Sequence, residues 1–330
     1  MSEWTKSNKE GVCEDRAVSD DVANANKITD QDDDSMGSET VSSGREGRQT
    51  ALVAAAQMTS TLDKYHNMAI CDRLARRAAD RRALMLFLPE CCDFMGSSAA
   101  ESSLHAEDLD GELMESFSKI ARETGLWLSL GGIHERGPNW EIDKKYYNSH
   151  VIVNSDGQLV SVYRKLHLFD ADLPGGVSFR ESEFTLPGKS ITDPVSTPLG
   201  KLGLAVCYDL RFPHLSWKLR EMGAEILTFP AAFSTPTGPA HWEVLLRARA
   251  IETQSWVVAA AQIGRHNPCR SSYGDALIAD PWGRVIARCG DGDDICVAEL
   301  RSETLQRVRR GMPILQHQRK DIDSKTENLR

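Results

Sequence analysis

Short apolar runs alternate with longer amphipathic segments along most of the chain. Continuous apolar runs indicate buried strands, and they lie at residues 51–57, 84–88, 126–132, 203–206, 225–229 and 256–262. Helical patterns lie at residues 60–82, 113–124, 213–222 and 240–254. Strands without polar alternation need cover on both faces. The alternation of such strands with helices therefore predicts an α/β fold.

Hairpin signals accompany these elements. Turn residues flanked by β-forming runs predict two hairpins, at 150–163 around Asp156-Gly157 and at 273–288 around Pro281-Trp282-Gly283. Residues 295–300 form a last apolar run that closes the sheet. The segment that follows carries Lys and Arg and lacks clear helix or strand boundaries, and we expect a tail that either packs on a partner or frays.

The first helix has a recognisable start and a predicted buried face. Ser60 followed by Asp63 resembles a capping box, so the helix should begin there. Helical periodicity then places four residues near the core-facing side, namely Tyr65, Ala69, Leu74 and Ala78.

The first 47 residues differ in composition from the rest of the chain. They are rich in Ser, Asn and Asp, include the run Asp32-Asp33-Asp34, and contain few large apolar groups. Such a segment cannot bury enough apolar surface to offset the entropy lost on ordering. We predict a disordered acidic extension over residues 1–47 and one folded domain over residues 48–330.

Composition limits the functions that the chain can have. A formal net charge of -9 argues against a general nucleic-acid-binding surface. No apolar run is long enough to span a bilayer, and the N-terminus lacks the pattern of a secretory or transit peptide. The 8 cysteines are scattered rather than spaced for a zinc site. We therefore expect a cytoplasmic protein with reduced thiols, no metal and no membrane association.

Cys207 occupies a position that exposes and activates a side chain. It follows the apolar run 203–206 and precedes Pro213, a residue favoured in the first turn of a helix. A strand-to-helix turn presents its side chain together with the following backbone N–H groups, and a helix N-terminus favours a thiolate. Because free cysteines are often buried and inert, this position needs a base and an oxyanion partner elsewhere.

Two further groups follow predicted strands and supply these partners. Glu90 follows the run 84–88, and Lys165 follows the first hairpin. Strand ends are where α/β sheets collect ligand chemistry. Glu90 would take the proton of the Cys207 thiol, and Lys165 with the N–H of Tyr208 would stabilise an oxyanion. A neighbouring cation also lowers a thiol pKa. Taken alone, Glu90 is as consistent with a solvated loop carboxylate.

The sequences around these groups resemble the three signature blocks of the nitrilase, or carbon–nitrogen hydrolase, superfamily. The blocks are Leu88-Pro89-Glu90, the run Tyr163 to Asp170 around Lys165, and the run Gly203 to Pro213 around Cys207. The resemblance extends from Ala51 to the C-terminus. It implies an α-β-β-α sandwich, a Glu-Lys-Cys triad, no cofactor, and association of two copies or more.

Within the superfamily, the chain is most similar to the Nit branch. The similarity lies in four segments, residues 225–233, 237–252, 257–262 and 280–283. It implies hydrolysis of deaminated glutathione to 2-oxoglutarate and Cys-Gly through a thioester. Two alternatives stay open: an ω-amidase acting on 2-oxoglutaramate or 2-oxosuccinamate, and a catalytically silent interaction protein on the same scaffold.

The resemblance also implies substrate contacts. Arg211 matches the position that binds an α-keto acid carboxylate, for which the guanidinium fork is suited. Its alternative partner would be an acid such as Asp209. The remaining implied contacts are Tyr208 beside the nucleophile, Phe233 and Thr237 in the pocket wall, and Glu181 as a second glutamate near the triad.

Overall fold

Two β-sheets form the centre of the fold. The computed structural model describes residues 50–173 and 177–319, and the extension predicted for residues 1–47 lies outside them. The larger sheet has the order β14-β13-β1-β2-β3-β4-β5, with β17 paired to β1 and β8 to β4. Its strands are β1 (Thr50–Met58), β2 (Met85–Leu88), β3 (Trp127–Arg136), β4 (Tyr146–Val153), β5 (Leu159–Arg164), β8 (Thr185–Leu186), β13 (Ala261–Asn267), β14 (Arg270–Tyr273) and β17 (Asp294–Arg301).

The smaller sheet has the order β16-β15-β12-β11-β10-β9, and β6 pairs with β7 separately. The strands are β6 (Asp170–Leu173), β7 (Val177–Arg180), β9 (Val195–Thr197), β10 (Gly200–Leu204), β11 (Ile226–Thr228), β12 (Trp256–Ala259), β15 (Leu277–Ala279) and β16 (Val285–Arg288). Strands β10, β11 and β12 are parallel neighbours. Both predicted hairpins, β4–β5 and β15–β16, form as antiparallel pairs.

The central strand β1 separates two hydrophobic cores. Val53 and Ala55 pack into the core that the two sheets share. Ala54 and Ala56 pack into a second core with side chains of the helices on the other face. Successive residues of a strand point to opposite faces of the sheet. A run that is apolar at every position therefore supplies both cores.

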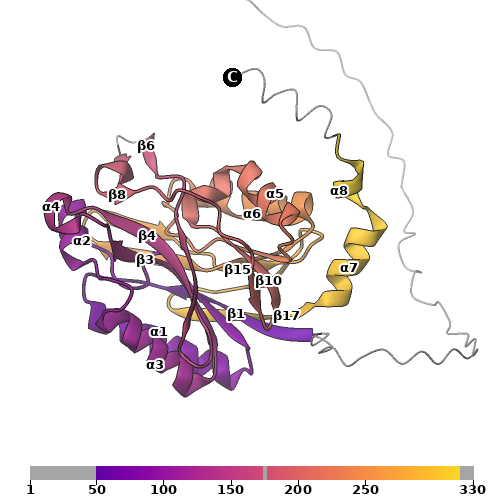
Figure 1. Cartoon of the computed structure of the whole chain (residues 1–330), viewed down its shortest axis with the longest axis horizontal. Coiled ribbons are helices and arrows are strands. Elements are labelled where there is room, and N and C mark those ends of the chain that lie inside the picture. The colour runs from indigo at the N-terminus through magenta and orange to yellow at the C-terminus, as the bar shows by residue number, and fades with distance from the viewer. Residues whose placement is uncertain (1–49, 174–176, 320–330) are drawn as a thin grey trace, which may run out of the picture. The chain divides into compact units, whose positions relative to one another are not determined.

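Helices cover the outer face of each sheet, as Figure 1 shows. Helices α1 (Lys64–Asp80) and α3 (Glu112–Thr124) pack on the larger sheet, and α5 (Pro213–Glu221) and α6 (Gly238–Thr253) pack on the smaller one. These layers confirm the predicted α-β-β-α sandwich. None of the described helices is long and apolar enough to cross a bilayer. The others are α2 (Ala99–His105), α4 (Trp140–Asp143), α7 (Ser302–Gly311) and α8 (Ile314–His317).

The first helix begins later than its sequence suggested. The Asp63 side chain accepts a hydrogen bond from the backbone N–H of His66 at 3.0 Å, so Asp63 is the N-cap and Ser60 is not. This start places Leu74 and Ala78 in the core but leaves Tyr65 84% exposed. Ala69 is exposed as well, so the predicted buried face was wrong over the first two turns.

The apolar run 256–262 is two strands rather than one. Strand β12 lies in the smaller sheet, whereas β13 pairs with β1 in the larger sheet. The chain passes between the sheets at Ala260, which is fully buried. Apolar periodicity could not reveal this crossing, because every residue of the run 256–262 is buried on either side of it.

The C-terminal segment predicted as a tail contains a packed helix. Leu305 and Val308 of α7 are buried. The Arg309 side chain donates hydrogen bonds to the carbonyl oxygens of Gln254 and Ala224 at 3.0 and 2.9 Å. Arg309, one of the basic residues of the predicted tail, thus satisfies backbone oxygens at the ends of other elements.

Candidate active site

A pocket of about 390 Å³ brings the three sequence candidates together. Its lining includes Glu90 after β2, Lys165 after β5 and Cys207 after β10. The side chains thus come from both sheets of the sandwich. No cluster of three or more His, Cys, Asp or Glu side chains suited to a metal ion occurs within the described residues.

Cys207 lies in a strained turn. It is the first residue of the 3₁₀ turn η2 (Cys207–Arg211) and has a φ of 46°. A positive φ is unusual for a residue with a side chain, and such strain is held only by the surrounding structure. Its backbone N–H donates to the carbonyl oxygen of Pro230 at 2.9 Å. The turn separates Cys207 from α5, so the thiol is not at the N-terminus of that helix.

Glu90 is a buried carboxylate with specific partners rather than a solvated loop residue. It is 4% exposed. Its Oε1 accepts from Lys165 Nζ at 3.0 Å and from Asn148 Nδ2 at 2.9 Å, and its Oε2 accepts from the N–H of Ala232 at 2.9 Å. Burial by itself raises the pKa of Glu90, but the Lys165 charge and a hydrogen bond with Cys207 outweigh it and lower that pKa to about 2. Glu90 is therefore ionised at neutral pH.

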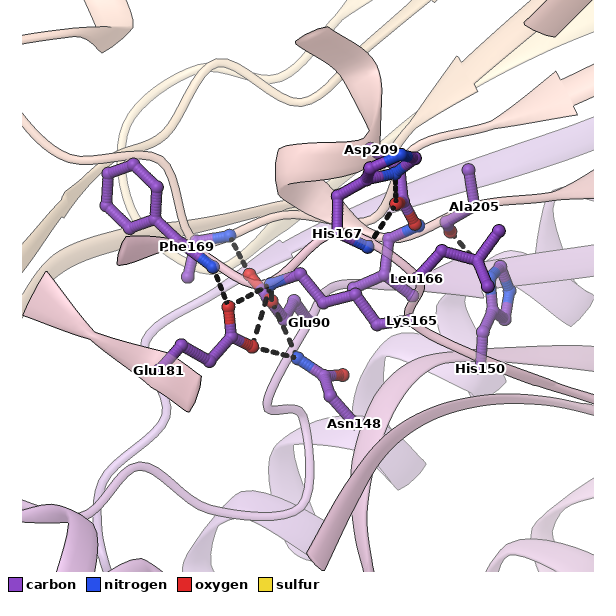
Figure 2. Close-up of polar contacts among 12 residues, drawn as sticks. Glu90, Asn148, His150, Lys165, Leu166, His167, Phe169, Glu181, Ala205 and Asp209 are labelled. Carbon is purple, nitrogen blue, oxygen red and sulfur yellow. Dashed lines mark hydrogen bonds and ion pairs between the residues drawn. The ribbon is translucent and has the colours of Figure 1, made fainter. Parts of the chain in front are cut away.

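Lys165 lies between two glutamates, as Figure 2 shows. Its Nζ contacts Glu90 Oε1 at 3.0 Å and both Glu181 carboxylate oxygens at 2.9 Å. Glu181 is itself held by the backbone N–H of Phe169 at 2.6 Å. Burial opposes the charge of Lys165, but the two carboxylates raise its pKa well above the usual value. An ammonium has three donors, and all of these face carboxylate oxygens.

The Cys207 thiol is protonated in this environment. Burial and the negative charge of Glu90 raise its pKa well above the usual value, and the nearby Lys165 charge offsets this only in part. The sequence-based expectation of a lowered thiol pKa was therefore wrong. A protonated thiol beside an ionised carboxylate requires proton transfer before it can act as a nucleophile.

A second buried carboxylate fixes the turn that carries Cys207. Asp209 has no exposed surface. It accepts from the Tyr163 hydroxyl at 2.7 Å, from the N–H of Val206 at 2.9 Å, and from the backbone N–H and Nδ1 of His167 at 3.1 and 2.7 Å. These bonds join β5 and the segment after it to the nucleophile turn. The sequence had suggested Asp209 only as an alternative partner for Arg211.

The predicted substrate contacts separate into two groups. Glu181 lines the pocket, whereas Arg211, Tyr208, Phe233 and Thr237 are absent from the described lining. Arg211 Nη1 lies 3.1 Å from His241 Nδ1, and its guanidinium lies 5.2 Å from the ring centre of Phe233 and 5.9 Å from that of Tyr208. Within the described chain, no ion pair joins Arg211 to Asp209.

Two polar residues at the site were missed by sequence reasoning. Asn148 donates through Nδ2 to Glu90 and, at 3.4 Å, to Glu181. Arg270, the first residue of β14, also lines the pocket. Asn148 lies two residues before the predicted hairpin strand, and Arg270 lies between predicted strands. Neither stands in a recognisable motif, so only the fold brings them to the site.

Comparisons with known proteins agree with the fold. The family model described as carbon-nitrogen hydrolase matches residues 52–310. A human protein named deaminated glutathione amidase is 55% identical over 271 residues, which cover 82% of this chain and 83% of that protein.

Two solved structures are also similar. The Caenorhabditis elegans NitFhit protein is 44% identical with a TM-score of 0.78, and the match covers 84% of this chain but 66% of that longer one. Saccharomyces cerevisiae Nit3, described as a member of branch 10 of the nitrilase superfamily, is 30% identical with a TM-score of 0.73. That match covers 82% of this chain and 97% of Nit3.

Proposed function

The chain belongs to the carbon–nitrogen hydrolase family and is a hydrolase that acts on amides, and we propose that its substrate is deaminated glutathione. The products would be 2-oxoglutarate and Cys-Gly. The 55% identity to the human protein of that name supports this substrate. The chemistry is supported independently by the groups that line the pocket.

One observation carries the proposed mechanism: an ionised Glu90 and a protonated Cys207 line the same pocket. We propose that Cys207 is the nucleophile and Glu90 its general base. As Sγ attacks the amide carbonyl carbon, the thiol proton passes to Glu90. The carbon–nitrogen bond then breaks, Glu90 returns the proton to the leaving amine, and a thioester stays on Cys207.

Hydrolysis of the thioester completes the cycle. Water attacks the thioester carbon while Glu90 accepts a proton, the carbon–sulfur bond breaks, and the sulfur regains a proton. The carboxylic acid product leaves ionised. Glu90 thus acts as base and acid in alternation, and no net proton is stored on the enzyme.

Lys165 would stabilise the negative charge that forms on the substrate oxygen. In the resting site its donors face Glu90 and Glu181. When Glu90 takes the thiol proton, its negative charge is lost and its hold on Lys165 weakens. One N–H of Lys165 can then turn to the oxyanion beside the backbone N–H of Tyr208. Glu181 would keep the ammonium charged and in place throughout.

The test is to measure 2-oxoglutarate release from deaminated glutathione and from 2-oxoglutaramate by wild type and by Cys207→Ala. We expect Cys207→Ala to lose at least about a thousandfold in kcat with an unchanged melting temperature. Cys269→Ala, which removes an exposed thiol from the same pocket wall, is the matched control. Normal turnover by Cys207→Ala would exclude this nucleophile, a preference for 2-oxoglutaramate would favour an ω-amidase, and no turnover of either amide would favour a silent scaffold.

We also propose that copies of the chain associate through the outer face of α6. Val244 and Ile251 are seven residues apart, so they share one face of this helix, and they are 60% and 50% exposed. Trp282, in the turn between β15 and β16, is 53% exposed. Exposed apolar side chains in a cluster are typical of interaction surfaces. Light scattering should give a mass above one chain, and Ile251→Glu should lower it.

The cytoplasm is the compartment that we propose. The seven cysteines within the described residues are all unpaired. A nucleophilic thiol must stay reduced to act, and cytosolic thiols are kept so. Fractionation of cells that produce the tagged chain would test the assignment, and enrichment with an organelle would contradict it.

A further inference from the structure

Arg270 differs from Arg180 and Arg211 because, within the described residues, its guanidinium has no hydrogen-bond or ion-pair partner. Arg180 pairs with Asp172 at 2.8 Å, and Arg211 contacts His241 at 3.1 Å. The Arg270 side chain is partly buried and forms no hydrogen bond or ion pair with the residues that the structure describes, and the Glu90 charge acts on it only at longer range. A charged group withdrawn from water without a partner is unfavourable. Such a group in a pocket is suited to bind an anion of the substrate.

The hairpin that carries Arg270 is fixed to the Glu90 side of the pocket. Gln262 of β13 donates through Nε2 to the carbonyl oxygens of Glu90 and Cys91 at 3.0 and 3.3 Å. Farther along the hairpin, Asn267 Nδ2 donates to the carbonyl oxygen of Gly96 at 3.2 Å. These bonds tie β13 and β14 to the loop that follows β2. Arg211, in contrast, lies in the Cys207 turn on the smaller-sheet side.

The rest of the charged site cannot bind a substrate carboxylate. Lys165 already directs its donors at Glu90 and Glu181. The two negative charges of Glu90 and Glu181 outnumber the single positive charge of Lys165, so this group would repel another anion placed beside it. Arg270 supplies the remaining positive charge of this half of the pocket. Its planar fork can bind a carboxylate through two parallel N–H···O bonds.

We propose that Arg270 binds the C-terminal carboxylate of the leaving Cys-Gly dipeptide. This inference rests on the proposed function, since it concerns the second half of the same substrate. The leaving nitrogen must face Glu90, because Glu90 returns the thiol proton to it. The dipeptide therefore extends along the Glu90 wall, where the β13–β14 hairpin presents Arg270. The enzyme then recognises the amine half of its substrate as well as the acyl half.

The test compares three substrates that share one acyl group. Deaminated glutathione carries the dipeptide carboxylate, its C-terminal amide lacks only that charge, and 2-oxoglutaramate lacks the dipeptide. We expect Arg270→Ala to lower kcat/KM for deaminated glutathione about a hundredfold and to change the other two less than about threefold. Wild type should prefer the free acid over its C-terminal amide by a similar factor.

Matched variants separate recognition from general damage. Arg265→Ala removes an exposed arginine of the same hairpin, whose side chain donates to the carbonyl oxygen of Asn267 and to no other described residue, and it should leave all three rates unchanged. Arg270→Lys should recover only part of the loss, because it keeps the charge without the fork. Equal losses on all three substrates, in a variant with wild-type melting temperature, would overturn the proposal and assign Arg270 to support of Glu90.

Inhibition by the product separates this inference from the proposed function. Cys-Gly should inhibit wild type more strongly than the C-terminal amide of Cys-Gly does. The assay can use either deaminated glutathione or 2-oxoglutaramate as substrate, whichever the enzyme hydrolyses. Arg270→Ala should abolish that difference. If deaminated glutathione is not hydrolysed but the difference is present and depends on Arg270, the substrate proposal fails and the carboxylate site stands. If wild type binds both dipeptides equally, the carboxylate site fails whatever the substrate.

Discussion

Two buried carboxylates, Glu90 and Asp209, contact the same segment of the chain: Glu90 contacts Lys165, and Asp209 contacts His167 two residues later. Figure 2 shows both carboxylates with these contacts. Glu90 lines the pocket and is paired with the cation of Lys165. Asp209 has no exposed surface, and its partners are two backbone N–H groups, a tyrosine hydroxyl and a histidine ring. The same functional group thus has two surroundings, one open to substrate and one closed.

The difference shows how the site divides chemistry from support. A carboxylate can exchange a proton with a substrate only if it reaches the pocket, and Glu90 does. The carboxylate oxygens of Asp209 instead accept hydrogen bonds from β5 and from the residue before the strained turn, in which Cys207 has a positive φ. We infer that Glu90 determines whether the thiol reacts and that Asp209 determines where the thiol lies.

Neutralising Glu90 is the strongest test of these different roles of Glu90 and Asp209. We expect Glu90→Gln to lower kcat at least about a thousandfold, within the range for loss of a general base. The same change should lower the thiol pKa, because the Glu90 charge and its hydrogen bond both raise the pKa of Cys207. Turnover would therefore fall while the fraction of Cys207 present as thiolate at a given pH would rise. Steady-state assays and a pH titration of thiolate absorbance measure the two quantities.

Glu181→Gln is the control for that experiment. It removes the negative charge of Glu181 that pairs with Lys165 but leaves the Glu90 carboxylate unchanged, so we expect a smaller loss of turnover. An unchanged thiol pKa in Glu90→Gln would show that Glu90 does not set the ionisation of Cys207.

A smaller effect is expected when Asp209 is changed. Asp209→Asn keeps the size but replaces an acceptor by an N–H donor that faces the donors of Val206 and His167. Breaking hydrogen bonds to a buried charged group costs about 2–3 kcal/mol of the free energy of unfolding. Turnover should fall about tenfold, through displacement of the turn. Urea unfolding and kcat, measured on the same preparation, check both.

Tyr163→Phe is a milder change at the same site, and its losses should be smaller than those of Asp209→Asn. It removes one of the donors to Asp209 and should cost about 1 kcal/mol of the free energy of unfolding, with turnover within about threefold of wild type. If Asp209→Asn lost as much turnover as Glu90→Gln while keeping wild-type stability, Asp209 would belong to the chemistry and the division would fail.

The sequence predicted the parts of the site that local pattern encodes. Glu90, Lys165 and Cys207 each follow a recognisable strand, β2 and β5 of the larger sheet and β10 of the smaller one, and strand ends are where α/β folds collect ligand chemistry. The alternation of apolar runs and helices predicted an α/β fold, and the resemblance to the nitrilase superfamily implied the sandwich. Arg270 was missed because its hairpin reaches the pocket only after the chain crosses between sheets at Ala260, and no local pattern marks that crossing.

The thiol pKa was misjudged for a related reason. A cation near Cys207 in the sequence argument suggested a lowered pKa, but desolvation is the largest contribution and acts in the other direction. Burial depends on the packing of both sheets around the pocket, which sequence spacing does not reveal. Motif residues can thus be located from sequence, whereas their ionisation depends on the assembled surroundings.

The last expected effect concerns stability rather than turnover, and it involves His150, a third buried group behind the nucleophile turn. Its Nδ1 lies 3.0 Å from the carbonyl oxygen of Ala205, and its Nε2 lies 2.6 Å from Ser129 Oγ. Burial lowers the pKa of His150 to about 4, and it does the same for His266. Both side chains are therefore neutral in the folded protein at pH 5, where an unfolded histidine is charged.

This difference makes stability depend on pH in a defined window. As pH falls below about 6.5, the unfolded chain binds protons that the folded chain does not, so the free energy of unfolding should fall by about 1–2 kcal/mol per histidine by pH 5. Glu90 does not contribute there, because its stabilising charge is lost only as pH falls from 4.5 through about 2. Urea unfolding of wild type and His150→Gln at several values from about pH 7.5 to about pH 5 measures the slope of the free energy of unfolding against pH. His150→Gln should roughly halve it, since His266 still contributes, and an unchanged slope would show that His150 is protonated in the folded protein.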